Sequence, residues 1–426
     1  MKSRKTNSTK RDLKNMENIT INYHATFSKT SGISEAARAN FSALKDSTFI
    51  LNQINYIENN IELIREGGPL QDSITDNIVN IYHININDIP CFLLNNDINI
   101  ASNTYNIAYW AWEFNKLPED FVSLLPLFDE IWVPSSFCQN VFASYSFKPV
   151  IKIPHLIERI EIEQSKPKIE LQDKFVFLSI FDSLSTPGRK NTDGLIKCFL
   201  DTFSANPNVV LILKTVNLEK NKRLHQKFIE QTKDHKSIIL INEDYTKKEL
   251  IQLIDSCHSY VSLHRAEGFG LTLAEAMSRN KIVIGTGYSG NLEFMNNQNS
   301  FLIHYELMIQ DKDSDFIKQG YEYAEPDIEN SKKVLKFVYD NYTHIEHIKL
   351  NGKQTIENSF SKKKIGDLMC SRLKKISAFI AEKESDFSIK KNDLIIENIR
   401  HQDKIKKSEK KIIFKAKLFF LRFFSK

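Results

Sequence analysis

The chain has 426 residues, of which 41% are hydrophobic and 26% are charged, and its formal net charge is +5 at pH 7. This composition is typical of a folded enzyme and excludes wholesale disorder. The length exceeds what one hydrophobic core usually serves, so two domains are expected.

The cysteines and the distribution of charge argue against further classes of protein. The five cysteines are far apart and form no C-x-x-C pair, which argues against a disulfide scaffold or a zinc site and for a reducing compartment. Residues 404–426 hold nine lysines or arginines against one acidic residue, so the rest of the chain is slightly acidic. The main part of the chain therefore does not have the basic charge that is typical of a nucleic-acid-binding protein.

Residues 1–17 are polar and charged without an apolar stretch, which predicts a disordered lead-in rather than a secretory signal. From residue 18 to about residue 345, strand-like runs alternate with helical patterns, which predicts parallel sheets covered on both faces. The expected strands are residues 18–24, 77–84, 106–112, 130–135, 174–180, 209–215, 237–242, 259–264 and 281–286, and the helical patterns include residues 35–44, 192–203, 247–257 and 271–279.

The polar segment ERIEIEQSKPKIELQDK, residues 158–174, is interpreted as a linker between two such sheets. We therefore expect an α/β protein with Rossmann-like, doubly wound domains at residues 18–170 and 171–345. Ligands of such sheets bind at the carboxyl ends of the strands, which predicts a cleft between the domains. Residues 346–380 are expected to be helices, with packing back onto the N-terminal domain as one possibility.

The end of the chain, residues 381–426, is predicted to be a basic amphipathic tail. Its apolar core, Ile412 to Phe424, is too short to span a bilayer, which needs about 20 apolar residues. Phenylalanines mixed with lysines favour a helix lying in an anionic membrane surface. A helix docked on the body or on a partner subunit is the alternative.

The stretch YVSLHRAEGFGLTLAEAM, residues 260–277, combines a strand, a glycine turn and a helix start. The free N–H groups and the dipole of a helix N-terminus favour an anion there. Glu267 and Glu275 flank this turn, and a carboxylate can accept two hydrogen bonds from a vicinal diol. Taken alone, the spacing also fits a surface helix with two unremarkable glutamates.

The longer segment HRAEGFGLTLAEAMSRNKIVIGTGYSGNLEFM, residues 264–295, resembles the E-x7-E region of retaining GT-B glycosyltransferases of family 4. Four more elements agree with that family in order: SGISEAARAN, DEIWVPSSFCQNVF, IPHLIE and RKNTDGLIKCFLDTF. The resemblance covers residues from about 18 to about 345. It implies a GT-B fold and transfer of a hexose, of mannose or glucose type, from a GDP- or UDP-linked sugar.

The resemblance also implies residue roles. Glu267 would accept hydrogen bonds from the donor sugar and Glu275 from the ribose, while Arg189 and Lys190 would stabilise the leaving diphosphate. Many relatives carry a further arginine where this chain has Asp182 and Ser183. Arg189 and Lys190 are therefore expected to stabilise the diphosphate without a further arginine. The alternative is that Arg189 and Lys190 simply lie in a solvent-exposed basic turn. The remaining expected donor-site residues are Gly268 and Gly270, which would let the backbone approach the sugar, Phe269, Leu271 and Thr272 through their N–H groups, and His264.

Two expectations concern the first domain. Gly32 is predicted to form a tight turn before a helix that begins near Ser34, facing the diphosphate or the acceptor, with simple helix capping by Ser34 as the alternative. Where some relatives place a histidine, this chain offers Trp110, Trp112 and Glu113. Glu113 is expected to contact the acceptor, and the indoles to stack on sugars, unless the strand simply buries them.

No cofactor and no metal are expected, because cationic side chains and a helix dipole would replace the metal. GTGYSG, residues 285–290, matches a dinucleotide-binding pattern with Glu306 downstream, and would indicate an NAD-dependent oxidoreductase. The segment that follows it is too short for the crossover helix of that fold.

The resemblance, together with the basic tail, thus implies a retaining hexosyltransferase that acts on a glycan or lipid-linked acceptor in surface polysaccharide or lipopolysaccharide synthesis. Its expected location is cytoplasmic, peripheral on the inner face of the membrane. A catalytically silent GT-B subunit that binds glycan or supports a partner transferase is the alternative from another class.

Overall fold

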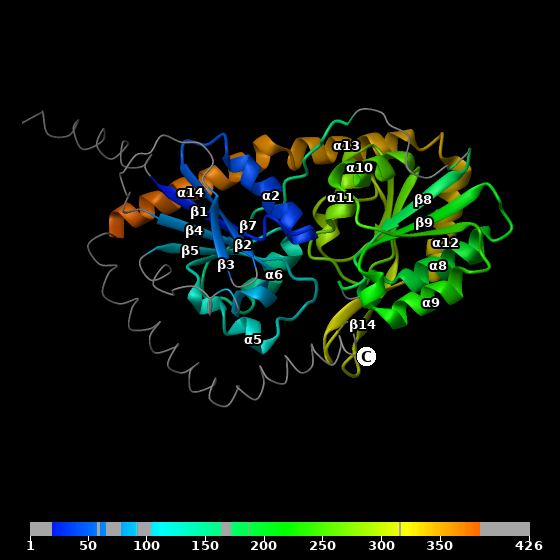
Figure 1. Cartoon of the computed structure of the whole chain (residues 1–426), viewed down its shortest axis with the longest axis horizontal. Coiled ribbons are helices and arrows are strands. Elements are labelled where there is room, and N and C mark those ends of the chain that lie inside the picture. Colours follow the sequence, from blue (N-terminus) through cyan, green and yellow to red (C-terminus); the bar gives the residue numbers. More distant parts are fainter. Residues whose placement is uncertain are drawn as a thin grey trace, which may run out of the picture.

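The structure is a computed structural model that describes residues 19–57, 60–64, 78–90, 92, 104–162, 171, 173–185, 187–314 and 317–383. Two α/β domains lie side by side, the first in blue and cyan and the second mainly in green (Figure 1). The predicted lead-in and residues 384–426 of the predicted tail lie outside the described residues.

The first domain is built on a seven-stranded sheet of order β3-β2-β1-β4-β5-β6-β7, in which only the β2–β3 pair is antiparallel among the described strands. β5 is buried along its whole length, as expected for a parallel sheet covered on both faces. The strands are β1 (Thr20–Ala25), β2 (Ile50–Ile57), β3 (Asn60–Ile64), β4 (Ile78–His83), β5 (Tyr105–Tyr109), β6 (Glu130–Val133) and β7 (Val150–Lys152), and the helices are α2 (Gly32–Leu44), η1 (Ile86–Asp88), α5 (Glu119–Val122), η2 (Leu125–Leu127) and α6 (Ser136–Ala143).

The second domain has a six-stranded, fully parallel sheet of order β10-β9-β8-β11-β12-β13. The predicted α/β class with two doubly wound domains is therefore confirmed. The strands are β8 (Phe175–Ile180), β9 (Val209–Thr215), β10 (Ile238–Asn242), β11 (Ser259–Ser262), β12 (Ile282–Thr286) and β13 (Phe301–Ile303), and the helices are α7 (Pro187–Lys190), α8 (Thr192–Phe203), η3 (Leu218–Lys220), α9 (Lys222–Thr232), α10 (Lys247–Ser256), α11 (Leu271–Ser278), η4 (Gly290–Glu293), α12 (Ile328–Asn341) and α13 (Glu346–Ser359).

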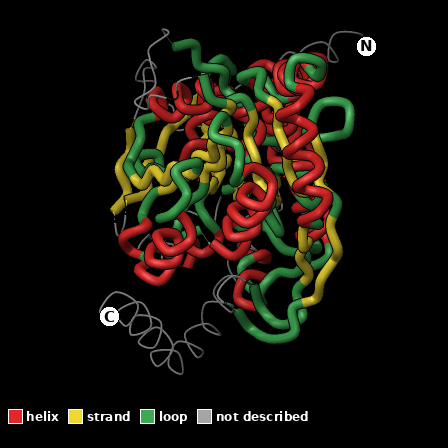
Figure 2. The backbone as a smooth tube through the Cα atoms, turned by 90° about the vertical axis from the view of Figure 1, so that its right-hand side faces the viewer, coloured by secondary structure: helices red, strands yellow, loops and turns green. Residues whose placement is uncertain are grey.

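A hairpin that the sequence did not predict follows β13. β14 (Tyr305–Ile309) and β15 (Glu322–Pro326) pair antiparallel outside the main sheets. Figures 1 and 2 agree that it extends beyond the body of the second domain.

The last described helix, α14 (Lys362–Lys383), returns to the first domain and packs along α2 (Figure 1). Gly366 permits this approach, because a Cβ there would lie 2.7 Å from the Ala43 carbonyl oxygen. Arg372 on α14 pairs with the fully buried carboxylate of Glu130, with 2.8 Å between Nε and Oε1. One face of the helix joins the first core through Ile365, Met369, Leu373 and Ile376.

Candidate active site

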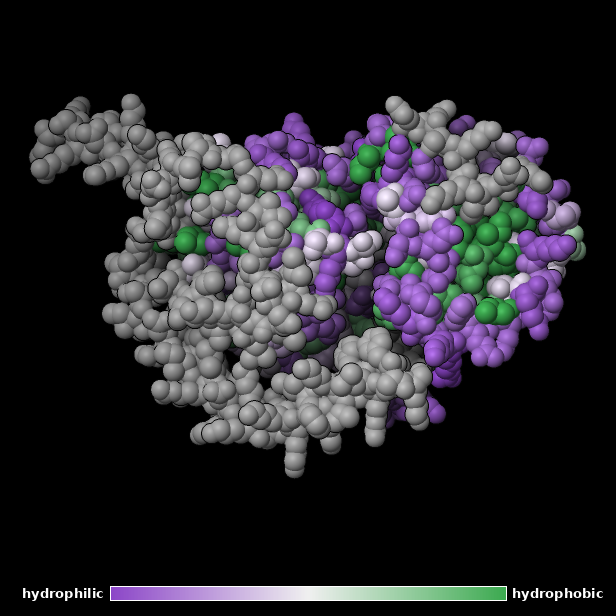
Figure 3. All heavy atoms as spheres, viewed as in Figure 1, coloured by the Kyte–Doolittle hydropathy of each residue, from purple (hydrophilic) through white to green (hydrophobic). Residues whose placement is uncertain are grey.

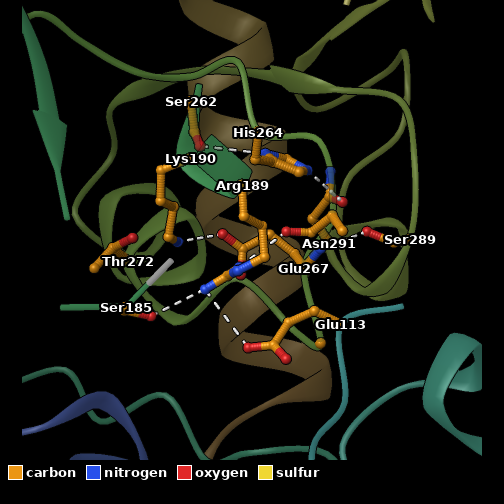
Figure 4. Close-up of polar contacts among 12 residues, drawn as sticks. Glu113, Ser185, Arg189, Lys190, Ser262, His264, Glu267, Thr272, Ser289 and Asn291 are labelled. Atoms are coloured by element: carbon orange, nitrogen blue, oxygen red, sulfur yellow. Dashed lines mark hydrogen bonds and ion pairs between the residues drawn. The ribbon is translucent and has the colours of Figure 1, made fainter. Parts of the chain in front are cut away.

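Three of the predicted site residues, Arg189, Lys190 and Glu267, meet where β11 ends, beside the short helix α7. Lys190 Nζ contacts Glu267 Oε1, and Arg189 Nη1 lies 3.2 Å from Glu267 Oε2 (Figure 4). Burial alone would raise the pKa of Glu267, but the charges of Lys190 and Arg189 outweigh it and lower this pKa to about 2. Glu267 is therefore ionised at neutral pH, which suits an acceptor of hydrogen bonds and not a general base.

The Arg189 guanidinium is buried and already bonded to other groups of the protein. Its guanidinium donates to the Ala266 carbonyl at 2.9 Å and to Ser185 Oγ at 3.1 Å, and Nη2 lies 3.5 Å from Glu113 Oε1. Glu113 belongs to the first domain and follows β5, so Arg189 joins carboxylates from both domains (Figure 4). The side chain of Arg189 is only 4% exposed against 16% for Lys190, which makes Lys190 the cation more accessible to a ligand.

The two motif glycines, Gly268 and Gly270, lie where the surrounding structure restricts a side chain. The Gly268 carbonyl accepts hydrogen bonds from Ser135 Oγ at 2.7 Å and from Cys138 Sγ at 3.3 Å, both in the first domain. A Cβ on Gly268 would lie 3.2 Å from Ala111 Cβ, a tight contact, so glycine favours close packing between the domains here. Gly270 precedes α11 with φ of 92°, a conformation that favours glycine.

Other residues that were predicted to contact the donor have side chains that bond to or pack against groups of the protein. The Phe269 ring is buried against His155 and is not open to a ligand, while the predicted contact through its main-chain N–H stays a prediction. Thr272 Oγ1 accepts a hydrogen bond from Tyr260 at 2.7 Å. His264 is fully buried, with Ser262 and Asn291 on its two ring nitrogens, which places it behind Glu267 as a support.

The indoles differ from the prediction of a stacking surface. Trp110 is buried in a second core cluster of the first domain, as the alternative interpretation expected, and cannot stack on a sugar. Trp112 is partly exposed, and its indole N–H donates to the Lys116 carbonyl at 2.6 Å.

Glu275 lines a pocket of about 410 Å³ between the domains. Its Oε1 contacts Lys247 Nζ, which also lies 3.7 Å from Glu35 Oε2 in the first domain. Burial would lower the pKa of Lys247, but the two carboxylates outweigh it and raise this pKa. Sequence reasoning missed Lys247, although the capping box of Thr246 and Glu249 marks the helix start that carries it. The lining comprises Ser28, Lys29, Thr30, Glu35, Arg38, Ala39, Leu156, Ile157, Glu158, Ile160, Lys247, Leu271 and Glu275.

The turn predicted at Gly32 is wrong in its geometry. Gly32 is the first residue of α2, has no positive φ, and a Cβ there would meet nothing within 4 Å. Ser31 caps the helix, while Ser34 is buried and hydrogen-bonds Thr26 at 2.7 Å. The loop just before the helix lines the pocket with Ser28 to Thr30 instead.

Glu293, which the sequence did not assign to the site, joins the domains. One carboxylate oxygen accepts hydrogen bonds from Ser136 N at 2.8 Å and Oγ at 2.9 Å, and the other lies 2.5 Å from Lys152 Nζ. The surface is hollowed where the two domains meet (Figure 3).

The GTGYSG segment supports the Glu267 turn. Ser289 Oγ accepts a hydrogen bond from Glu267 N at 2.8 Å, and a Cβ on Gly290 would overlap the Gly268 carbonyl. The short helix η4 follows it, rather than the long crossover helix of a dinucleotide-binding unit. This geometry disfavours the oxidoreductase interpretation.

Within the described ranges, no group of three or more His, Cys, Asp or Glu side chains is placed to hold a metal ion. Across the same part of the chain, no helix combines the length and apolar character needed to traverse a bilayer.

The second domain is similar to a known protein family. A family model described as Glycosyl transferases group 1 matches residues 161–353. No curated protein matches the chain. Among solved structures, sucrose-phosphate synthase from Thermosynechococcus elongatus superposes with a TM-score of 0.61 at 11% identity, covering 84% of this chain and 100% of that one.

Anabaena Alr3699/HepE, solved with UDP-glucose, gives a TM-score of 0.60 at 13% identity and covers 84% of this chain and 99% of its own. The fold is GT-B. Staphylococcus aureus TarM gives 0.51 at 15% identity over 71% of this chain, which spans 57% of the length of TarM. At these identities the similarity shows the GT-B arrangement of two domains and not the reaction.

Proposed function

We propose that this protein is a retaining glycosyltransferase that moves a hexose, of mannose or glucose type, from a nucleotide diphosphate sugar to a glycan or lipid-linked acceptor. The observation that carries this proposal is the group of Lys190, Arg189 and Glu267 at the domain boundary, together with Glu275 in the adjacent pocket. The match of the second domain to a glycosyltransferase family supports it.

In this proposal the donor lies along α11. Glu275 accepts hydrogen bonds from the ribose hydroxyls, and the ionised Glu267 accepts them from the sugar. Lys190 has three N–H donors, of which Glu267 uses one, so two can reach the oxygens of the departing diphosphate. Stabilising that negative charge lowers the barrier to cleavage of the sugar–phosphate bond. No metal or other cofactor is required.

Glu113 is proposed to contact the acceptor hydroxyl. It lies across Arg189 from Glu267, and about a third of its side chain is exposed. Because Arg189 pairs with it, Glu113 is suited to orienting the acceptor, and the leaving phosphate is proposed to take the acceptor proton.

The experiment that tests this function is a panel of nucleotides and nucleotide sugars. UDP and GDP are added to the purified chain in a thermal-shift assay, because a ligand that binds the folded state raises the transition temperature. Release of nucleotide is then measured from UDP-glucose, UDP-N-acetylglucosamine and GDP-mannose. UDP-glucose is the first choice, since Alr3699/HepE was solved with it. Binding without any release would instead identify a catalytically silent subunit.

We also propose that the enzyme acts in surface polysaccharide or lipopolysaccharide synthesis at the inner face of the membrane. The support is the basic, phenylalanine-rich sequence of residues 404–426, which lies outside the described residues. A chain that lacks residues 404–426 should no longer sediment with anionic vesicles. Unchanged sedimentation would remove the membrane proposal and leave the transferase proposal intact.

A further inference from the structure

The β14–β15 hairpin spans the gap between the domains. Gly320, in the loop of the hairpin, accepts a hydrogen bond from Lys116 Nζ at 2.7 Å. The Glu322 N–H donates to Asn115 Oδ1 at 2.9 Å. The Tyr321 ring meets Phe114 edge-on, with 6.3 Å between ring centroids. All three first-domain partners immediately follow Glu113.

The base of the hairpin is bound to the turn that carries the cations. Arg265 forms a two-pronged ion pair with Glu325, at 2.6 Å from Nε and 2.8 Å from Nη2. The same guanidinium donates to the Gly188 carbonyl at 2.7 Å, and the Arg265 main-chain N–H donates to the Arg189 carbonyl at 2.8 Å. The Ala324 N–H in turn donates to the Arg265 carbonyl at 2.9 Å. Arg265 thus connects the hairpin to α7.

An apolar cluster fills the space between these two anchors. Phe114 of the first domain and Ile317 of the hairpin loop are buried together with Ala266. Ala266 precedes Glu267, and its carbonyl receives the hydrogen bond from Arg189. Trp112, Tyr288, Tyr321 and Tyr323 pack around the cluster. Glu113 and Arg189 are therefore attached to one continuous packed unit that includes the hairpin.

We propose that the β14–β15 hairpin is a positioning element that sets Glu113 opposite the Arg189–Lys190 turn, with Arg265 and Glu325 as its positioning residues. The inference rests on the proposed transferase function. The hairpin is proposed to act through these residues and not on the nucleotide, because none of its described residues lines the pocket that contains Glu275. A planar guanidinium held by two bonds to a carboxylate has little freedom to shift. Displacing catalytic groups by about 1 Å can cost roughly 100-fold in rate.

Two variants test the proposal from opposite ends of the hairpin. Glu325→Gln removes the charge that orients Arg265, and Tyr321→Ala removes the ring that holds Phe114. Ile309→Ala is the matched control, because Ile309 is on the same hairpin and 67% exposed. Hydrolysis of the nucleotide sugar that the wild type accepts gives kcat, titration with UDP or GDP gives Kd, and hydrogen exchange reports on residues 111–118 and 187–190.

The expected result is a kcat at least about 10-fold lower in both variants, a nucleotide Kd within about twofold of the wild type, and faster exchange in the two segments. Ile309→Ala should match the wild type in all three. Normal turnover in Glu325→Gln and Tyr321→Ala, or a nucleotide affinity that falls in step with kcat, would overturn the proposal.

Hydrogen exchange separates this inference from the proposed function. If the wild type releases no nucleotide from any sugar donor, the transferase assignment fails. The exchange of residues 111–118 and 187–190 still answers whether the hairpin positions them, and unchanged exchange in both variants would refute that role.

Discussion

Replacing Arg372 by methionine should destabilise the protein strongly, because it leaves a charge in the first core. Glu130 is fully buried, and both of its oxygens face Arg372 on α14. Its other partners, Tyr105 and Trp132, are neutral and donate at 3.1 and 2.7 Å. Removing one partner of a buried ion pair costs about 3–5 kcal/mol. The two remaining hydrogen bonds keep the expected loss near 3 kcal/mol, at the lower end of that range.

The assay is urea unfolding of the wild type, Arg372→Met, Glu130→Gln and the double variant. Glu130→Gln combined with Arg372→Met should recover more than half of the loss, because a neutral amide needs no cation. Lys375→Met, an exposed position on the same helix, serves as the control. A loss below 1 kcal/mol for Arg372→Met would be that of an exposed ion pair and would refute the reasoning.

Three further outcomes are expected. Glu275→Ala should weaken UDP or GDP binding at least 10-fold, as measured by titration calorimetry, while Glu267→Ala should mainly lower kcat. Equal nucleotide affinity in the wild type and in Glu275→Ala would contradict this assignment. Burial lowers the pKa of His24 to about 4 and that of His155 to about 3. Below pH 6.5 the unfolded chain binds protons that the folded chain does not, so the free energy of unfolding should fall by about 1.4 kcal/mol per pH unit for each histidine until the pH reaches its folded pKa. Equal unfolding free energies at pH 7 and pH 5 would refute this. Gly268→Ala should lower turnover and leave nucleotide affinity unchanged, because its Cβ would push against the first domain; wild-type kcat would show that the contact yields without consequence.

Continuous apolar runs made much of the fold predictable. β9 and α8 begin and end at the predicted residues, because each is an unbroken buried strand or a clear amphipathic helix. β2 was missed, since asparagines interrupt its apolar pattern. In the sheet these amides satisfy one another across strands: Asn52 donates to Asn22, Asn22 to Asn80 and Asn80 to Asn106, each at 2.9 Å. A side-chain ladder of this kind depends on register, which local sequence does not reveal.

The site was predictable where recognisable sequence motifs carry it. Glu267, Lys190 and Arg189 come together as expected, because the E-x7-E turn and α7 both follow strands of one sheet. Contacts between domains were not predictable in the same way. Lys247, which pairs with Glu275 in the second domain, also lies 3.7 Å from Glu35 of the first domain, and Gly268 packs against Ala111 of the first domain.

The most direct test of the account is nucleotide release from UDP-glucose, UDP-N-acetylglucosamine and GDP-mannose by the wild type and by Lys190→Met. The account predicts release from at least one donor. It also predicts a loss of roughly 100-fold or more in Lys190→Met, with the nucleotide still bound through Glu275. Release from none of the donors, or undiminished release by Lys190→Met, would contradict the claim that this group of charges cleaves an activated sugar.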